Sequence, residues 1–364
     1  MTHLSNVLFV GPLPPPIGGY TAIGKTFVEA WRTNTGMYPD IVNTSPGRSK
    51  NIEGVVDIRD IVRGGRIVWE MVLKASRTKP ILFLATVPLY RRIRNVLYLL
   101  KKVGNVPVVV WFSGGVVHHV LENITRSKKN SIINSLRNLD LVVVETALVR
   151  DGLSRMGVNN SIMIPNSRIV EWDALPMPRR AVGRPLRVLF LGRIIEEKGV
   201  LTLIEAVERA NLQSFSVCCD LYGPIDPGIE QRFLAACSTS DNVRYGGVVT
   251  DDPVDFIANY DLLALPTWFP REGHPGVIIE AMMAGIPVVV TNHMSLTELV
   301  DDGVNGRVVP PRSVESLAEA IAYFADDDVS YHRLASAHRA RLVRHDATEA
   351  VRVLRERMAE TIDV

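Results

Sequence analysis

The sequence predicts an α/β protein built from two Rossmann-like domains, on three observations. Short apolar segments alternate with amphipathic segments along nearly the whole chain, which is typical of parallel sheets covered by helices. The alternation pauses in a stretch rich in proline and arginine at 171–185 and then starts again. With 364 residues, 47% of them hydrophobic and 22% charged, the chain is long enough for two ordinary cores.

In the first half, apolar runs predict strands at 7–11, 80–85, 106–112, 141–145 and 161–165. Amphipathic spacing predicts helices at about 20–31, 58–77, 88–103, 120–138 and 147–156. We place the linker at 171–185, and therefore expect an N-terminal domain over 1–172 and a C-terminal domain over 173–345.

In the second half, strands are expected at 186–192, 215–222, near 243, 262–265, 286–290 and 307–309. Helices are expected at 197–210, 228–238, 254–259, from 275 to Gly285, and at about 314–325, 330–343 and 347–361. The strands and helices of each half thus form consecutive βα units, which predicts a parallel sheet in each domain.

The net charge of +2 is unevenly divided between the halves. Residues 1–175 carry 22 Lys and Arg against 12 Asp and Glu, and the rest carry 19 against 27. The basic half could meet an anionic surface or substrate. Cys218, Cys219 and Cys237 have neither metal-ligand spacing nor a disulfide pattern, which fits a reducing compartment. No signal peptide and no long apolar run are evident, so we expect a cytoplasmic protein, with peripheral association on the inner face of the membrane as an open alternative.

The stretch 268–291 holds the main candidate site. Glu272 lies in a loop, Pro275 and Gly276 can begin a helix, and Glu280 lies inside that helix. The free N–H groups at such a helix start, here those of residues 276–278, attract anions, phosphate above all. Two acids flanking a phosphate site predict a clamp for a nucleotide sugar. The alternative is an ordinary loop–helix–strand unit whose glutamates lie on a solvated face.

Further candidates follow other predicted strands. Arg193 and Lys198 come after the strand that ends at 191–192, and Gly18 and Gly19 come after the first strand. Ligands of open parallel sheets bind at the carboxyl ends of strands, so these residues and Glu272 could line one cleft between the domains. The two cations would neutralise a diphosphate. The alternative for them is a solvated helix start.

Residues 19–26 match the P-loop pattern letter for letter, with Lys25 in the lysine position. In a P-loop the glycine run directly follows an apolar strand, whereas here three prolines intervene. The competing interpretation places Lys25 and Thr26 in the helix, while Gly18 and Gly19 let the backbone approach a ligand.

The predicted helix at 89–102 has one basic face. This face indicates either an anionic membrane surface as a partner or an ordinary solvated side of a sheet-covering helix. Its cations are Arg91, Arg92, Arg94, Lys101 and Lys102.

Taken together, these residues resemble the family-4 retaining glycosyltransferases of the GT-B fold, in which two Rossmann-like domains face each other across a cleft. The resemblance covers essentially the whole chain. It rests on Glu272-x7-Glu280 with its Glu-Ala-Met-Met-Ala-Gly-Ile-Pro-Val-Val continuation, Leu191-Gly192-Arg193 with Lys198-Gly199, Pro-Pro-x-Gly-Gly at 15–19, and Ile164-Pro165-Asn166.

The resemblance implies a UDP- or GDP-linked sugar donor, transfer to a glycan or lipid-linked acceptor in cell-surface polysaccharide or glycolipid synthesis, and no nucleic-acid partner. It implies retention of the anomeric configuration and no essential metal or other cofactor, and no convincing metal cluster is evident in the sequence. The N-terminal domain would bind the acceptor, with the helix at about 346–364 crossing back to it, and the C-terminal domain would bind the donor.

Carried over by position, Glu272 and the backbone of 273–277 would hold the donor sugar and β-phosphate, and Glu280 the ribose. Arg193 and Lys198 would bind the diphosphate and stabilise its departure, and Gly18 and Gly19 would close over the donor. The backbone near four further residues would contact the base. The donor-binding set thus includes Tyr222, Gly223, Val248, Val249, Gly273, His274, Pro275, Gly276 and Val277.

Two positions depart from the family pattern. The family usually has a histidine after the strand at 106–112, where this chain has Ser113, followed by Gly114 on the acceptor side. His118 or His119 could replace it as a catalytic group from the next turn, or be an ordinary structural or surface histidine. Asn166 is followed by Ser167 instead of glycine. A nucleotide-sugar-binding relative with weak catalysis is therefore an alternative to an active enzyme.

Overall fold

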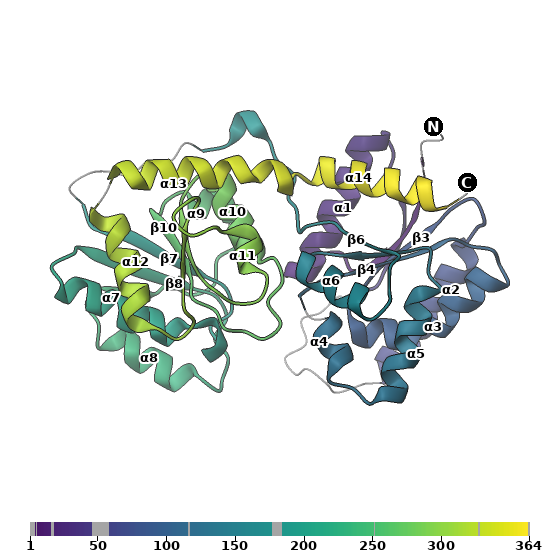
Figure 1. Cartoon of the computed structure of the whole chain (residues 1–364), viewed down its shortest axis with the longest axis horizontal. Helices are drawn as coiled ribbons and strands as arrows, with labels where there is room; N and C mark the ends of the chain where they lie inside the picture. Colours follow the sequence, from purple (N-terminus) through teal and green to yellow (C-terminus); the bar gives the residue numbers. More distant parts are fainter. Residues whose placement is uncertain are drawn as a thin grey trace. The chain divides into compact units, whose positions relative to one another are not determined.

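The chain forms two α/β units, each around one parallel sheet (Figure 1). The computed structural model describes residues 4, 6–15, 18–45, 58–115, 117–176, 184–250, 252–326 and 328–362. Unit 1 comprises Met1–Ile169 and Asp346–Val364, and unit 2 comprises Val170–His345. The predicted α/β class with two Rossmann-like sheets is therefore confirmed.

The sheet of unit 1 has six parallel strands in the order β2-β1-β3-β4-β5-β6. Its central strands are buried on both faces, which explains why they appear in the sequence as continuous apolar runs. The strands are β1 Leu8–Gly11, β2 Asp40–Asn43, β3 Ile81–Ala85, β4 Val108–Phe112, β5 Leu141–Val144 and β6 Ser161–Met163.

Helices cover both faces of this sheet. On one face α1 and α14 lie side by side and bury Phe27, Trp31 and Leu354 (Figure 1). On the other face α2, α3 and α5 bury Met71, Leu97 and other apolar side chains. The helices are α1 Gly19–Thr35, α2 Ile58–Lys74, α3 Val87–Lys102, α4 Val117–Glu122, α5 Arg126–Arg137, α6 Ala147–Arg155 and α14 Ala347–Thr361.

Unit 2 repeats this plan with the strand order β12-β11-β10-β7-β8-β9. The strands are β7 Leu186–Leu191, β8 Val217–Tyr222, β9 Val243–Tyr245, β10 Leu262–Leu265, β11 Val288–Thr291 and β12 Arg307–Val309. The helices are α7 Val200–Leu212, α8 Glu230–Ser238, α9 Pro253–Ile257, α10 Gly276–Ala284, α11 Leu296–Leu299, α12 Val314–Asp326 and α13 Asp328–Ala340. Short 3₁₀ turns occur at η1 Trp172–Ala174, η2 Glu196–Lys198 and η3 Arg341–His345.

The structure corrects the sequence prediction in a few elements. The predicted helix at 120–138 is two helices, α4 and α5, with a break before Thr125, the residue that precedes α5. The predicted helix at 197–210 is the turn η2 followed by α7, because Gly199 between them has the left-handed φ of 74°. The strand β2 and the helix α11 were not predicted.

Within the described ranges, every helix is too short or too polar to cross a membrane.

Candidate functional site

The loop that follows β10 carries Glu272 into the interior of unit 2. The side chain of Glu272 is 8% exposed, and the Nζ atom of Lys198 lies 2.7 Å from its Oε2 atom. Thr267 donates a hydrogen bond from Oγ1 to the same Oε2 atom at 2.9 Å. The structure thus brings together two of the predicted catalytic residues, and Lys198 itself is only 13% exposed.

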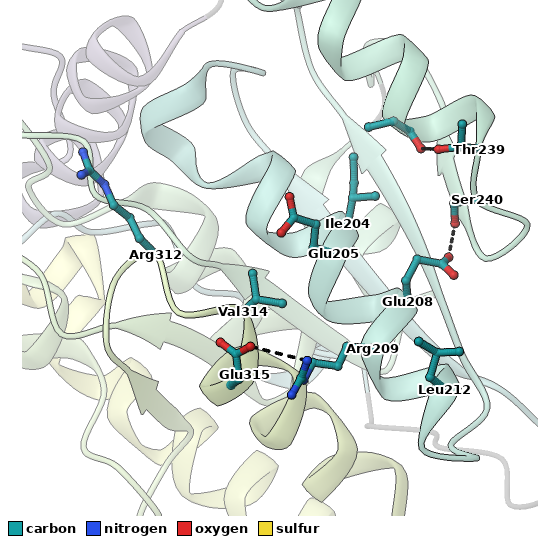
Figure 2. A pocket seen from close by; sticks show the side chains of 11 residues that line it. Ile204, Glu205, Glu208, Arg209, Leu212, Thr239, Ser240, Arg312, Val314 and Glu315 are labelled. Atoms are coloured by element: carbon teal, nitrogen blue, oxygen red, sulfur yellow. Dashed lines mark hydrogen bonds and ion pairs between the residues drawn. The ribbon is translucent and has the colours of Figure 1, made fainter.

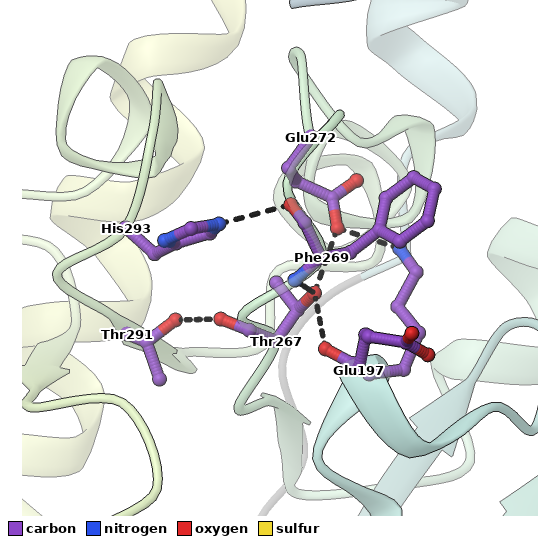
Figure 3. Close-up of polar contacts among 7 residues, drawn as sticks. Glu197, Thr267, Phe269, Glu272, Thr291 and His293 are labelled. Carbon is purple, nitrogen blue, oxygen red and sulfur yellow. Dashed lines mark hydrogen bonds and ion pairs between the residues drawn. The ribbon is translucent and has the colours of Figure 1, made fainter.

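Buried threonines fix the path of this loop (Figure 3). The Oγ1 atom of Thr267 accepts a hydrogen bond from the N–H of Phe269 at 3.1 Å, and Thr291 donates to the carbonyl of Thr267. His293, in the turn after β11, donates from Nε2 to the carbonyl of Phe269 at 2.9 Å. The neighbouring strand end therefore holds the loop in the conformation that presents Glu272.

Gly199 explains how Lys198 comes to face this loop. A Cβ atom on Gly199 would lie 2.2 Å from the carbonyl oxygen of Pro266, and its φ of 74° is left-handed. Trp268 donates from its backbone N–H to the carbonyl of Glu197 at 2.7 Å. Gly199 therefore allows the two strand-end loops to pack backbone against backbone, and the side chain of the adjacent Lys198 reaches Glu272.

A cluster of cations surrounds the ring of Phe269. The guanidinium carbon of Arg193 lies 5.4 Å from the ring centroid, Lys198 Nζ lies 5.7 Å away, and the guanidinium carbon of Arg271 lies 5.3 Å away. Arg193 is exposed to solvent. The two strand ends thus converge on a positively charged surface beside Glu272.

The helix α10 begins immediately after this surface. Pro275 is its N-cap and not its first helical residue, and Gly285, with a φ of 74°, ends it as expected. The N–H of Ile278 already donates to the carbonyl of Pro275 at 3.1 Å, so the prediction that this N–H is free was wrong. The N–H groups of Gly276 and Val277 have no acceptor within the helix, as at every helix start. Glu280 is half-buried on α10.

His274 is buried behind the start of α10. Its Nε2 atom lies 3.2 Å from Glu298 Oε2 in α11, and its ring centroid lies 6.0 Å from that of His345. Gly273 beside it is also buried. The side chain of His274 thus braces the loop from within unit 2.

The residues predicted to contact a base lie at the ends of β8 and β9. Gly223 donates to the carbonyl of Gly247 at 2.8 Å, and a Cβ atom on Gly223 would lie 1.8 Å from the carbonyl oxygen of Gly192. Because β8 pairs with β7, this places Tyr222 and Gly223 beside the loop that carries Arg193. Val248 is 60% exposed and Val249 is half-buried.

In unit 1, the predicted residues lie at the start of α1 and after β4. Gly18 precedes α1, where its N–H donates to Thr21 Oγ1 at 3.0 Å. A Cβ atom on Gly18 or Gly19 would meet no described atom within 4 Å. Packing within the described part of unit 1 therefore does not require glycine at these positions, which is compatible with a requirement imposed by a ligand.

Ser113 and Gly114 lie close to a buried acid. The N–H of Gly114 donates to Glu145 Oε2 at 2.9 Å, and Glu145 is 3% exposed. Burial, together with the nearby charge of Glu145, raises the pKa of Tyr20 above its usual range. His119 is exposed on α4, with Nδ1 3.3 Å from Glu122 Oε2, and the side chain of His118 lies outside the described residues.

The structure does not support the P-loop hypothesis. The whole segment 19–26 lies inside α1, so these eight residues do not form a phosphate-cradling loop. Lys25 is exposed, and a Cβ atom on Gly24 would lie 2.1 Å from the carbonyl oxygen of Pro12. Gly24 is therefore needed for the packing of α1 against the preceding turn.

An open hollow of about 530 Å³ lies over α7, away from the predicted site residues (Figure 2). Its polar groups largely satisfy one another, since Arg209 lies 3.5 Å from Glu315 and Ser240 donates to Glu208. The candidate site is therefore better defined by the charged loops of unit 2 than by this hollow.

Similarity to known proteins agrees with this geometry. Residues 185–327 match the family model described as Glycosyl transferases group 1. The chain carries a group 1 glycosyl transferase domain within a GT-B fold. The matched range contains the Lys198–Glu272 pair and α10, and the predicted family is confirmed at this level.

Curated relatives share part of their length with the chain. The alpha-D-kanosaminyltransferase of Streptomyces kanamyceticus is 32% identical over 157 residues, which are 42% of this chain and 39% of that protein. The lipopolysaccharide core biosynthesis glycosyltransferase LpsE of Rhizobium meliloti is 28% identical over 223 residues, 60% of this chain and 64% of that protein. The chain thus spans less than two thirds of the length of these relatives.

Solved structures are similar over nearly the whole chain. The sucrose-phosphate synthase of Thermosynechococcus elongatus has a TM-score of 0.75 and 19% identity, with 99% of each chain covered. HepE of Anabaena, in complex with UDP and glucose, has a TM-score of 0.68 and 19% identity, with 98% of this chain and 100% of that chain covered. These similarities establish the fold.

The sequence prediction missed several residues of the site. Thr267 and Thr291 are buried polar residues at strand ends. The sequence signal that could have found them is a threonine at the end of an apolar run. Phe269, Arg271 and His293 carry no recognisable pattern, since their roles depend on contacts between loops.

Proposed function

We propose that the chain is a glycosyltransferase that moves a sugar from a UDP- or GDP-linked donor to a glycan or lipid-linked acceptor. The buried Lys198–Glu272 pair, whose glutamate lies in the loop before α10 and which falls inside the matched family range, is the observation that carries this proposal. Relatives named for colanic acid biosynthesis and lipopolysaccharide core biosynthesis support the acceptor class.

In the proposed reaction the bond between the sugar and the β-phosphate oxygen breaks, and the oxygen of an acceptor hydroxyl forms the new bond and releases its proton to solvent. The nucleoside diphosphate leaves with the electron pair, so negative charge develops on its β-phosphate. Arg193 and Lys198 would stabilise that charge, and such stabilisation is usually the largest contribution to catalysis. An ammonium group has three N–H donors, so Lys198 can bind Glu272 and still donate to phosphate.

Glu272 and the backbone of 273–277 would hold the sugar and the β-phosphate, and Glu280 would bind ribose hydroxyls. The N–H groups of Gly276 and Val277 at the start of α10 suit an anion. We further propose that the anomeric configuration is retained and that no metal takes part, with unit 2 binding the donor and unit 1 the acceptor. Gly18 and Gly19 would then close over the donor.

A thermal-shift panel of UDP- and GDP-sugars tests donor binding first. A matching donor at 100 times its Kd stabilises the protein by about 2.7 kcal/mol. With that donor, alanine at Glu272, Arg193 or Lys198 should abolish turnover, while Glu280→Ala should mainly raise the donor KM. Full activity in Glu272→Ala would disprove the mechanism.

Two controls separate this proposal from its alternatives, a P-loop nucleotide hydrolase and a relative that only binds nucleotide sugars. If Lys25 served a P-loop nucleotide hydrolase, Lys25→Ala would abolish activity; it should leave transfer unchanged, because Lys25 is an exposed residue inside α1 and not part of a phosphate-binding loop. Measurable transfer, or slow hydrolysis of the donor, would exclude a relative that only binds nucleotide sugars. The anomeric configuration of the product, read by NMR, tests retention.

We also propose that α3 meets an anionic membrane surface. Arg91, Arg92 and Lys102 are exposed, whereas Arg94 is half-buried and Lys101 pairs with Asp140 at 2.6 Å. The basic face available to lipid is therefore smaller than the sequence suggested. On α2, which packs against the same core, Trp69 and Leu73 are each 64% exposed, and exposed apolar side chains add to the attraction of cations to a bilayer interface.

Sedimentation with vesicles containing anionic lipid tests this surface. Binding should be strong in low salt and weaker in high salt, and Arg91→Glu with Arg92→Glu should abolish it. Arg352→Glu, an exposed charge reversal on α14, is the matched control and should bind normally. Equal binding of the two variants would contradict the proposal.

A further inference from the structure

Arg271 is a cation of the loop between β10 and α10, and neither sequence pattern nor packing gives it a role. It is exposed, it immediately precedes Glu272, and its guanidinium carbon lies 5.3 Å from the centroid of Phe269. The turn that carries it is closed by a hydrogen bond from the N–H of Glu272 to the carbonyl of Phe269 at 3.1 Å. Its backbone is thus positioned by the same contacts that position Glu272.

The surroundings of Arg271 are unusually positive. Arg193 and Lys198 approach the same ring, at 5.4 Å and 5.7 Å, so three cations gather around Phe269. Of these three cations, Lys198 pairs with the carboxylate of Glu272. Within the described part of the chain, neither Arg193 nor Arg271 forms an ion pair with a carboxylate. The four side chains together therefore have a net charge of two positive units.

Such a cluster suits a bound diphosphate. Cations around one ring repel one another, while each cation–π contact at an exposed site contributes only about 0.5–1 kcal/mol. A guanidinium next to an aromatic ring keeps the N–H donors on its edge available for bidentate phosphate binding. A nucleotide-sugar diphosphate carries one negative charge on each phosphate, and this would balance the cluster.

We infer that Arg271 is a third phosphate-binding cation of the donor site, acting beside Arg193 and Lys198. This inference rests on the proposed function and adds a residue to it. Without Arg271 the net charge of the cluster would be one positive unit, which is too small to balance the diphosphate. The need for Arg271 increases as the donor bond breaks, because the departing nucleoside diphosphate gains a further negative charge.

Isothermal titration with UDP, GDP and inorganic pyrophosphate tests the inference on the whole chain. Arg271→Gln should weaken binding of the matching nucleoside diphosphate about tenfold, corresponding to one charge-assisted hydrogen bond of about 1.4 kcal/mol. Binding of pyrophosphate should weaken similarly, while binding of the corresponding nucleoside should not change. Arg271→Lys should recover part of the affinity, and kcat of transfer should fall in Arg271→Gln.

Arg312→Gln is the matched control. Arg312 is another exposed arginine of unit 2 against an aromatic ring, with its guanidinium carbon 3.8 Å from the centroid of Trp268. Its loss should leave nucleoside diphosphate binding unchanged. If the wild-type protein binds nucleotide sugars and Arg271→Gln binds the nucleoside diphosphate equally well, the inference is wrong. If the wild type binds no nucleotide sugar, the proposed function itself fails.

Discussion

The stability of unit 2 should fall in mild acid because of one buried histidine. His338 in α13 is fully buried, and burial lowers its pKa from the usual 6.5 to about 3. The nearby His345 and Arg341 also disfavour a second proton on the ring, while the carbonyl of Ile278 in α10 favours it. The neutral ring accepts a hydrogen bond at Nδ1 from the amide of Asn305 at 3.2 Å.

The size of the effect follows from proton linkage. Between pH 6.5 and pH 3 the unfolded chain binds a proton at His338 and the folded chain does not, so the free energy of unfolding falls as the pH falls. Each pH unit in this window contributes about 1.4 kcal/mol. Relative to pH 8, where both states are neutral, the loss at pH 5 is about 2 kcal/mol.

Urea denaturation at pH 8 and pH 5 measures this loss. His338→Gln keeps an acceptor for Asn305 but cannot titrate, so its free energy of unfolding should depend less on pH, by about 2 kcal/mol over this interval. The other titratable groups are common to both proteins and cancel in the comparison. His332→Gln, which removes the neighbouring histidine of the same helix, is the control and should keep the wild-type pH dependence.

An equal pH dependence in His338→Gln and the wild type would refute the reasoning. It would mean that the folded protein accepts the proton, by opening the packing between α13 and α10. Because α10 begins at the proposed donor site, donor affinity at pH 5 would then fall in the wild type but not in His338→Gln.

Three further predictions concern the loops that follow β7, β10 and β11. Gly199→Ala should destabilise unit 2 by at least about 2 kcal/mol in urea, because the left-handed backbone costs a side chain about 1–2 kcal/mol and its Cβ would meet Pro266. Lys198→Met should cost about 3–5 kcal/mol of stability by leaving the carboxylate of Glu272 buried, and adding Glu272→Gln should restore most of it. His293→Ala should lower kcat more than it changes donor affinity, with partial rescue by His293→Gln, because His293 holds the carbonyl of Phe269.

Most of the fold could be predicted from the sequence because its local signals agree with one another. The stretch that ends α10 shows this, since the apolar period, Gly285 and the following Pro287 all indicate the same stop. The strand β2 was missed because it is an edge strand of four residues, only one of them buried. The break between α4 and α5 was missed because it depends on the tertiary placement of two short helices.

The site was predictable where backbone chemistry restricts the residue type. Gly199 and Gly223 are examples, because a Cβ atom at either position would strike a neighbouring carbonyl oxygen. The contacts of Phe269 and His293 join loops that are 24 residues apart, and no local period reveals such a pair. Lys101 was predicted to belong to a basic face because the sequence shows its charge. The sequence does not show its ion pair with Asp140, which neutralises that charge.

The Lys198–Glu272 pair connects stability and function in unit 2. A buried ion pair gives weak evidence of stabilisation, since removing the two charges from water costs several kcal/mol. Packing alone would accept apolar residues at these positions, and Gly199 would remain necessary for the backbone contact with Pro266. The chain nevertheless has a desolvated lysine and carboxylate here, beside Arg193 and Arg271, which form no ion pair within the described residues. An anionic, hydroxyl-rich ligand explains this arrangement better than folding does. A Lys198→Met, Glu272→Leu protein should accordingly be at least as stable as the wild type in urea while binding no donor.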